Sequence, residues 1–310
     1  AQIRLPALLD AYYASAAFLR VYQDFSPSYA LVLERERGEE RLALLCLDPS
    51  AFLQKAVGRA RSAVAFSATL SPMDYYRDLL GMEGCRTLAV DSPFDPANFL
   101  PLTLPLDTTW KKRENTASEV ALALHAMVSS HPGHYLAFFP SYGYLKTVQK
   151  ALESLADYPV IQQDRDMTAR ARASFLKRFD GEADTLLGLA VMGGVFGEGI
   201  DLVGERLIVV AVVSVGLPQI GSRRDLIKKY FDETRGSGFN YAYVYPGMGK
   251  VLQAAGRVIR THEDRGVALL IDQRFSRQPY RGLFPGHLQP TAVRTYGELM
   301  DRFKKFWQNS

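Results

Sequence analysis

The chain contains little cysteine. Cys46 and Cys85 are the two cysteines among 310 residues, and they form no C-x-x-C pair. This pattern excludes a disulfide framework and a thiolate metal site. It favours a reducing compartment, which we take to be the cytoplasm, with both thiols packed as small apolar side chains.

Long apolar runs are also missing. The longest, over residues 207–213, is much shorter than the roughly 18 residues that a membrane span needs. The first residues carry no apolar core of a secretory signal. The start at Ala1 rather than methionine leads us to expect a processed chain or a piece of a longer one.

A large excess of positive or negative charge is missing as well. The chain has 37 Lys and Arg against 33 Asp and Glu, a net charge of +4, which leans only weakly towards an anionic partner. A composition of 47% hydrophobic and 23% charged residues excludes disorder and fibrous repeats. The length is enough for about two domains of roughly 150 residues.

The part of the chain before residue 111 predicts a few separate elements. Apolar residues at helical or alternating spacing indicate helices and strands, and a turn at Gly38 indicates a hairpin. Four prolines make residues 91–110 a candidate linker. The expected helices here cover 6–23 and 49–61, and the expected strands cover 29–36, 41–47 and 63–66.

Beyond this linker, apolar strands alternate with helices. This order predicts an α/β fold with a parallel sheet covered on both faces. Ligands bind such sheets at the carboxyl ends of the strands. The expected strands are 135–139, 160–163, 185–191, 206–214, 241–245 and 267–272; the expected helices are 116–130, 142–156, 168–179, 222–233, 249–260 and 291–307.

A glycine-rich segment follows the expected strand 185–191. Four glycines within residues 193–199 allow backbone amides to approach a phosphate or a nucleic-acid backbone closely. Glu198 and Asp201 add carboxylates for a ribose hydroxyl or a metal-bound water. The alternative is an ordinary glycine-rich turn between two strands.

The expected helix 249–260 carries polar residues at regular spacing. Gln253, Arg257 and Arg260 fall at i, i+4 and i+7, which is one helical face. Two guanidinium groups a turn apart suit a polyphosphate, because each offers a planar fork of donors. The alternative is a solvated helix face with two surface arginines.

Two further segments follow expected strands. Ser67, Ala68 and Thr69 come after 63–66, and the small hydroxyls of Ser67 and Thr69 either bond a neighbouring loop or cap the next helix.

The second segment follows the expected strand 135–139. Ser141 is a candidate N-cap whose exposed amides also suit a phosphate. Phe139 and Tyr142 either stack on bases or pack in the core.

Taken in their order along the chain, from Ser67 to Arg260, the four segments resemble the C-terminal motor region of a superfamily 2 helicase, with the closest likeness to the DinG/XPD family. The resemblance covers about residues 60–275 and is most specific at Glu-Gly-Ile-Asp (198–201), Gln-Ala-Ala-Gly-Arg-Val-Ile-Arg (253–260) and Ile-Asp-Gln-Arg-Phe (271–275). It implies a RecA-like second motor domain over residues 96–310. Residues 1–95 are then the tail of an arch-like insertion, with a helix and a β-hairpin, and the end of the first motor domain.

The resemblance also implies roles for single residues. Arg260 is expected to act as an arginine finger beside Arg257, and Gln253 to contact the nucleotide. The other implied sites are a nucleotide-binding group of Gly197, Glu198, Gly199 and Asp201, a coupling group of Ser67, Ala68 and Thr69, and a DNA-binding group of Phe139, Ser141, Tyr142 and Gly194.

The sequence departs from the helicase pattern in one large respect. It contains no G-x-x-x-x-G-K-[ST] and no Asp-Glu-x-His, so the phosphate cradle and the metal-holding carboxylates are missing. We therefore expect ATP and Mg²⁺ to bind jointly with a first motor domain that is not in this chain, and the chain alone to be inactive. Two distant cysteines exclude an iron–sulfur cluster in this chain. The implied partners are single-stranded DNA, ATP and the missing motor domain, without a membrane.

Two other hypotheses remain open. One is a non-catalytic module that binds nucleic acid or a helicase partner. The other is a nucleotide-binding α/β enzyme, such as a transferase, that uses the loop 193–199; this leaves the Gln253, Arg257 and Arg260 pattern unexplained.

Overall fold

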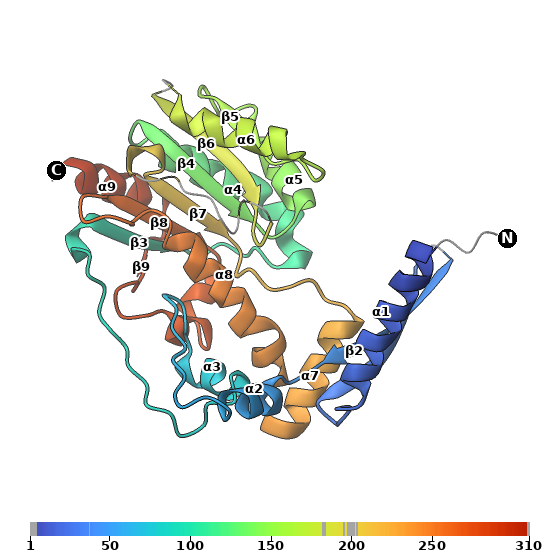
Figure 1. Cartoon of the computed structure of the whole chain (residues 1–310). Coiled ribbons are helices and arrows are strands. Elements are labelled where there is room, and N and C mark those ends of the chain that lie inside the picture. Colours follow the sequence, from blue (N-terminus) through green and yellow to red (C-terminus); the bar gives the residue numbers. More distant parts are fainter. Residues whose placement is uncertain are drawn as a thin grey trace. The chain divides into compact units, whose positions relative to one another are not determined.

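The computed structural model describes residues 5–36, 38–181, 184–194, 196, 202 and 204–308. The chain forms two compact units (Figure 1). The helix–hairpin unit comprises Ala1–Ser67, Pro72–Thr87 and Gln219–Tyr243, and the sheet unit comprises Ala68–Ser71, Leu88–Pro218 and Val244–Ser310.

The sheet unit is built on seven parallel strands in the order β5-β6-β4-β7-β8-β3-β9. This confirms the expected α/β class with a parallel sheet. The strands are β3 (Phe99–Leu104), β4 (Gly133–Phe139), β5 (Val160–Gln162), β6 (Thr185–Val191), β7 (Val209–Val213), β8 (Gly266–Ile271) and β9 (Thr291–Ala292).

Helices cover both faces of this sheet (Figure 1). Side chains alternate between the faces along each strand, so Tyr135 and Ala137 of β4 join one core while Leu136 and Phe138 join the other. The first core is closed by α4 (Arg113–Val128), α5 (Tyr142–Leu152) and α9 (Tyr296–Gln308), and the second by α6 (Ala169–Lys177) and α8 (Tyr245–Ala255). Short 3-10 turns occupy Pro96–Asn98, Trp110–Lys112, Arg178–Asp180, Gly204–Arg206, Gln273–Ser276 and Tyr280–Leu283.

The helix–hairpin unit contains the expected helix and hairpin. Its elements are α1 (Leu5–Tyr22), the antiparallel pair β1 (Tyr29–Glu36) and β2 (Glu39–Cys46), α2 (Ser50–Val57), α3 (Met73–Leu79) and α7 (Ser222–Arg235). Asp78 of α3 accepts hydrogen bonds from Arg235 Nη1 at 2.9 Å and from the Tyr241 hydroxyl at 2.7 Å. These bonds explain why residues 219–243 belong to this unit, whereas the sequence predicted one continuous motor domain over 96–310.

Four expected elements are wrong; one of them is the helix 249–260, which ends at Ala255. Residues 63–66 form no strand: no described strand pairs with them, and Val64 and Phe66 are 84% and 90% exposed. The expected linker contains β3, whose Pro101 is tolerated because β9 pairs only with Leu102 and Thr103 of that strand.

The fourth error concerns the alternating tyrosines of 241–245. These residues form the π-helix Asn240–Val244, which leads into α8. Tyr241 stacks on Phe231 of α7 with ring centroids 4.3 Å apart, and the Tyr243 hydroxyl donates to Asp225 of α7 at 3.1 Å. Contacts with a helix earlier in the chain therefore outweigh the strand pattern.

In the described part of the chain, no helix is both long and apolar enough to cross a bilayer. Cys46 and Cys85 are free and half-buried, and burial raises the pKa of the Cys46 thiol above its usual value.

Candidate functional site

The carboxyl ends of β4, β5 and β6 are joined by one buried amide side chain. Gln163 follows β5 and is 3% exposed. Its Nε2 donates to the Tyr142 hydroxyl at 2.8 Å, and its Oε1 accepts from the backbone N–H of Val191 at 2.8 Å. The glutamine thus holds the start of α5 against the end of β6.

Two glycines after β6 allow a lysine to approach the backbone. Gly193 has φ +73°, and a Cβ there would lie 2.9 Å from Lys250 Nζ; one at Gly194 would lie 3.2 Å from Gln163 Nε2. Lys250 has no carboxylate partner among the described residues. The Arg165 guanidinium lies 5.6 Å from the centre of the Tyr142 ring. Lys250 and Arg165, beside Gly193, Gly194 and Tyr142, form a surface that suits an anionic ligand, and we call it the glycine surface.

The first turn of α5 adds backbone donors to this surface. Ser141 is the N-cap, and its Oγ accepts from the backbone N–H of Tyr144 at 3.3 Å. Ser141, Tyr142 and Gly194 therefore lie at the predicted edge of the sheet.

The expectation that Phe139 stacks on DNA is wrong. Its side chain is fully buried, and it packs edge-on against Tyr144 with ring centroids 6.1 Å apart. As the last residue of β4, it points into the core beneath α4 and α5.

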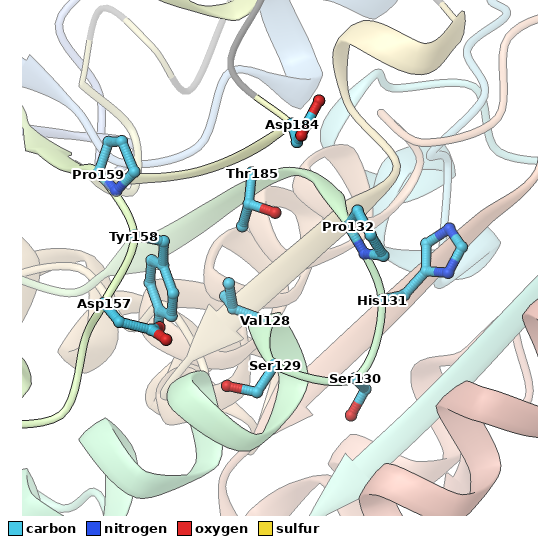
Figure 2. Close-up of a pocket in the computed structure, with 10 residues that line it drawn as sticks. All are labelled: Val128, Ser129, Ser130, His131, Pro132, Asp157, Tyr158, Pro159, Asp184 and Thr185. Carbon is cyan, nitrogen blue, oxygen red and sulfur yellow. The ribbon is translucent and has the colours of Figure 1, made fainter.

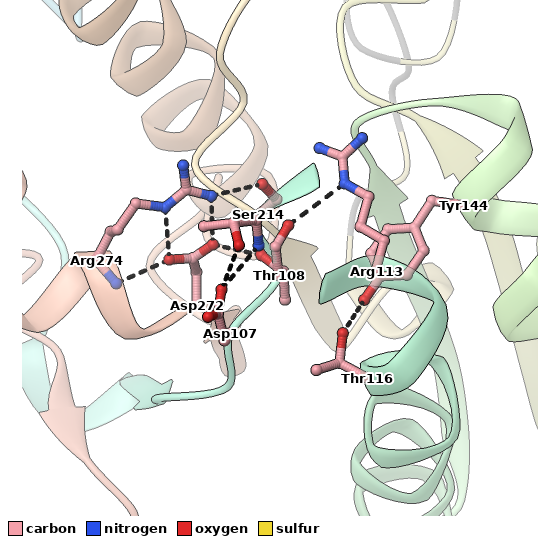
Figure 3. A network of polar contacts seen from close by, with 9 residues as sticks. Asp107, Thr108, Arg113, Thr116, Tyr144, Ser214, Asp272 and Arg274 are labelled. Atoms are coloured by element: carbon pink, nitrogen blue, oxygen red, sulfur yellow. Dashed lines mark hydrogen bonds and ion pairs between the residues drawn. The ribbon is translucent and has the colours of Figure 1, made fainter. Parts of the chain in front are cut away.

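A second polar cluster lies at the carboxyl ends of β3, β7 and β8 (Figure 3). Asp272 is fully buried, and its Oδ1 accepts from the backbone N–H and the Nε of Arg274 at 2.7 and 2.9 Å. Its Oδ2 accepts from Arg274 Nη2 at 2.6 Å and from the Thr108 hydroxyl. Burial lowers the pKa of Arg274, but the hydrogen bond and charge of Asp272 outweigh it, and the net pKa is raised.

This cluster also holds a strained residue. Ser214 follows β7 with φ +76°, a left-handed conformation that costs a non-glycine residue about 1 kcal/mol. Its Oγ accepts from Arg274 Nη2 at 3.1 Å, and its N–H donates to Ile271 O at 3.0 Å. The pair of Arg274 and Asp272 therefore stabilises the turn after β7.

A loop at the same edge follows β3. Asp107 accepts from the Thr109 hydroxyl at 2.6 Å and from the Thr109 N–H at 3.1 Å. These hydrogen bonds lower the pKa of Asp107 below its usual value. Arg113 Nε donates to Thr108 O at 3.3 Å, which fixes the other end of the loop.

The expected helical face of Gln253, Arg257 and Arg260 is wrong. Helix α8 ends at Ala255, and Gly256 is its C-cap. A loop follows, and Asp264 Oδ2 holds it by accepting the N–H groups of both Arg260 and Thr261 at 2.7 Å.

This loop lies far from the glycine surface. A Cβ on Gly266, the first residue of β8, would lie 2.6 Å from the Cβ of Val258. The two arginines therefore precede β8 at its amino end, whereas Tyr142 and Gly193 follow the carboxyl ends of their strands.

The remaining predicted residues do not join either cluster. Ser67 belongs to the helix–hairpin unit, and Ala68 and Thr69 to the sheet unit. Ser71 Oγ donates to Leu283 O at 3.0 Å, which holds this segment to the sheet unit. The predicted nucleotide-binding residues Gly197, Glu198, Gly199 and Asp201 lie outside the described residues.

A cavity of about 600 Å³ lies at the opposite, amino edge of the sheet (Figure 2). Its walls precede β4, β5 and β6, and none of the predicted site residues lines it. The lining residues are Val128, Ser129, Ser130, His131, Pro132, Asp157, Tyr158, Pro159, Asp184 and Thr185.

Sequence reasoning missed four residues of these clusters: Gln163, Lys250, Asp272 and Arg274. A usable signal existed for three of them. Gln163, Asp272 and Arg274 lie at or just after the ends of expected parallel strands, where ligands bind. Nothing in the local pattern pointed to Lys250.

Comparison with known proteins shows which protein family the chain resembles. A family described as helicase C-terminal domain matches residues 124–291, more than half of the chain. The chain is 24% identical over 303 residues to the ATP-dependent DNA helicase chl-1 of Caenorhabditis elegans, covering 90% of this chain and 36% of the relative. It is 26% identical over 301 residues to the ATP-dependent DNA helicase YoaA of Escherichia coli (strain K12), covering 93% and 46%. It spans less than half the length of both relatives.

Solved structures show the same fold. A structure of an XPD helicase matches with a TM-score of 0.65 at 17% identity, covering 90% of this chain and 50% of that chain. A structure of apo XPD matches with a TM-score of 0.62 at 17% identity, covering 90% and 56%. The expected RecA-like arrangement is confirmed.

Proposed function

Because the chain belongs to the family of helicase C-terminal domains, as its resemblance to DinG/XPD helicases predicted, we propose that it is the C-terminal motor part of an ATP-dependent DNA helicase. The whole enzyme couples ATP hydrolysis to translocation on single-stranded DNA and to duplex unwinding. The observation that carries this proposal is the glycine surface after β6, where Lys250 Nζ lies over Gly193 beside Gln163 and Tyr142. Its chemistry suits a nucleic-acid backbone.

On this proposal the glycine surface binds phosphates of the strand. Lys250 and Arg165 supply the charges, the first-turn amides that follow Ser141 donate hydrogen bonds, and Gly194 leaves room for the backbone of the strand. Gln163 takes no part in binding itself; it fixes Tyr142, whose ring supports the Arg165 guanidinium. DNA therefore lies along the carboxyl edge of the sheet.

The loop after α8 that contains Arg257 and Arg260, which we call the arginine loop, contacts the nucleotide. The first motor domain supplies the phosphate cradle and holds Mg²⁺, while Arg260 and Arg257 reach the γ-phosphate from this chain. Asp264 supports this role because it fixes the loop backbone, so the arginines are presented on a rigid turn. The resemblance assigns nucleotide binding also to Gly197, Glu198, Gly199 and Asp201, nucleotide contact to Gln253, and the coupling of hydrolysis to movement to Ser67, Ala68 and Thr69.

The test measures binding of the chain to a fluorescent oligothymidine by anisotropy, at several salt concentrations. The two phosphate contacts of the glycine surface contribute about −1.4 to the slope of log affinity against log salt, so by themselves they weaken binding roughly sevenfold for a fourfold rise in salt. Lys250→Gln is expected to weaken binding and to flatten the slope by about 0.7. The matched control, Lys150→Gln, changes an exposed lysine near the end of α5 and keeps wild-type binding.

The non-catalytic alternative makes a different prediction. It shares the DNA surface but needs no ATP turnover by any longer protein that contains this chain. DNA-stimulated ATPase activity of the full-length protein supports the helicase, and its absence supports the binding module. If the affinity for oligothymidine changes neither with salt concentration nor in Lys250→Gln, both the helicase and the binding-module hypotheses are contradicted.

A further inference from the structure

A large aromatic side chain stands exposed at the carboxyl edge of the sheet. Trp110 lies in the loop between β3 and α4 and is 78% exposed. Lys111 and Lys112 follow it, and both are exposed. An exposed indole beside cations is a typical surface for stacking nucleobases, because every base has a flat face and a nearby phosphate.

The neighbouring arginine supports one side of this indole. The Arg113 guanidinium carbon lies over the Trp110 ring, 5.4 Å from its centre, and it also lies 5.4 Å from the centre of the Tyr144 ring. In the described part of the chain Arg113 has no carboxylate partner. Burial lowers its pKa, and the nearby charge of Arg274 acts in the same direction. A desolvated guanidinium without a counter-ion favours an anionic oxygen.

Buried hydrogen bonds hold this turn in place. Thr108 is fully buried and donates to Asp272, and its carbonyl accepts from Arg113 Nε (Figure 3). At the other end, Thr116 Oγ1 donates to Lys112 O at 3.0 Å and bonds the Tyr144 hydroxyl at 3.1 Å. Trp110 is therefore presented on a fixed backbone, which reduces the entropy lost on binding.

We propose that Trp110 is a stacking platform for a base of single-stranded DNA, and that Arg113 holds the adjacent phosphate. The proposal rests on the proposed function, since it adds a second contact to the same strand. Its argument is charge complementarity: Lys111 and Lys112 follow Trp110, and Arg113 lies over its ring. These three cations outnumber the two nearest carboxylates of the segment, Asp107 and Glu114. Stacking on Trp110 recognises the base, whereas the glycine surface contacts the backbone.

The chain offers its own probe for this contact. It has two tryptophans, Trp110 and Trp307. Trp307 stacks on His131, before β4 at the amino edge, with ring centroids 4.6 Å apart. Trp307→Phe therefore leaves Trp110 as the single tryptophan, which is excited at a wavelength that the 16 tyrosines do not absorb. Oligothymidine is expected to quench its emission saturably, at the midpoint found by anisotropy.

Substitutions separate stacking from charge. Trp110→Ala is expected to weaken oligothymidine binding about tenfold without changing the salt slope, and Trp110→Phe to restore most of it. Arg113→Gln is expected to flatten the slope by about 0.7, the share of one phosphate. Trp307→Phe is the control and keeps wild-type affinity. Thermal unfolding of each variant verifies that the fold is kept.

The outcomes distinguish this proposal from the proposed function. Wild-type affinity in Trp110→Ala, together with weaker binding in Lys250→Gln, overturns the platform and leaves the helicase proposal intact. If the wild-type chain binds no oligothymidine, both fail. If ATP quenches Trp110 at a lower concentration than oligothymidine does, Trp110 binds a free nucleotide, and the proposal that it stacks on a DNA base is overturned.

Discussion

The amide side chain of Gln163 bonds the backbone N–H of Val191 at 2.8 Å, and so joins the segment after β5 to the last residue of β6. The bond is fully buried, and the same side chain reaches Tyr142. One residue outside the regular strands thus sets how three strand ends meet. The surface proposed for DNA depends on this arrangement.

Gln163→Leu tests that dependence. Leucine keeps the volume but leaves the Val191 N–H buried and without an acceptor, which costs about 1–3 kcal/mol of unfolding free energy. Urea unfolding measures this loss. The control Gln253→Ala changes an exposed glutamine of the same unit and is expected to alter stability by less than about 0.5 kcal/mol. Equal stability of both variants would contradict the structural role of Gln163.

Asp272→Ala tests the second cluster. It removes the buried carboxylate partner of Arg274, whose side chain is 21% exposed, so we expect a cost of about 3 kcal/mol, the lower end for a broken buried ion pair. The strained Ser214 turn also loses its support. Removing the charge of Arg274 as well, in Asp272→Asn with Arg274→Gln, is expected to recover part of the loss. Chemical unfolding compares these variants with Asp301→Ala, an exposed aspartate of α9. A cost below about 1 kcal/mol for Asp272→Ala would show that the pair does not stabilise the fold.

Arg260→Ala tests the arginine loop in the full-length protein. An arginine finger stabilises charge in the transition state, so its loss is expected to lower kcat about 10³-fold. DNA affinity without ATP is expected to stay unchanged, because the loop lies at the amino end of β8. Arg170→Ala, on the exposed side of α6, is the control.

The same proposal predicts that the chain alone shows no DNA-stimulated ATPase activity, because it lacks the phosphate cradle. A steady-state ATPase assay with single-stranded DNA measures this directly. Robust turnover by the purified chain would be incompatible with a divided active site, and near-normal turnover of Arg260→Ala would reject the finger.

Much of the fold was predictable from local pattern. The apolar run 185–191 predicts a strand, and the helical periodicity of 142–152 predicts a helix. Tyr142, Ser141 and Gly194 were also placed correctly at the carboxyl edge, because parallel strands share that edge. Phe139 was not, since alternation along β4 directs it into the core.

By itself, the sequence determined the parallel α/β class, the helicase-like order of its segments and the edge at which polar residues gather, because these follow from local periodicity and residue order. The tertiary structure alone decided that Asp264 holds the loop at Arg260, that Asp78 bonds residues 219–243 within the helix–hairpin unit, and that Arg113 lies over Trp110. The reason is physical. Each of these features depends on a bond or ring contact that local periodicity does not encode, and only the folded chain brings the partners together.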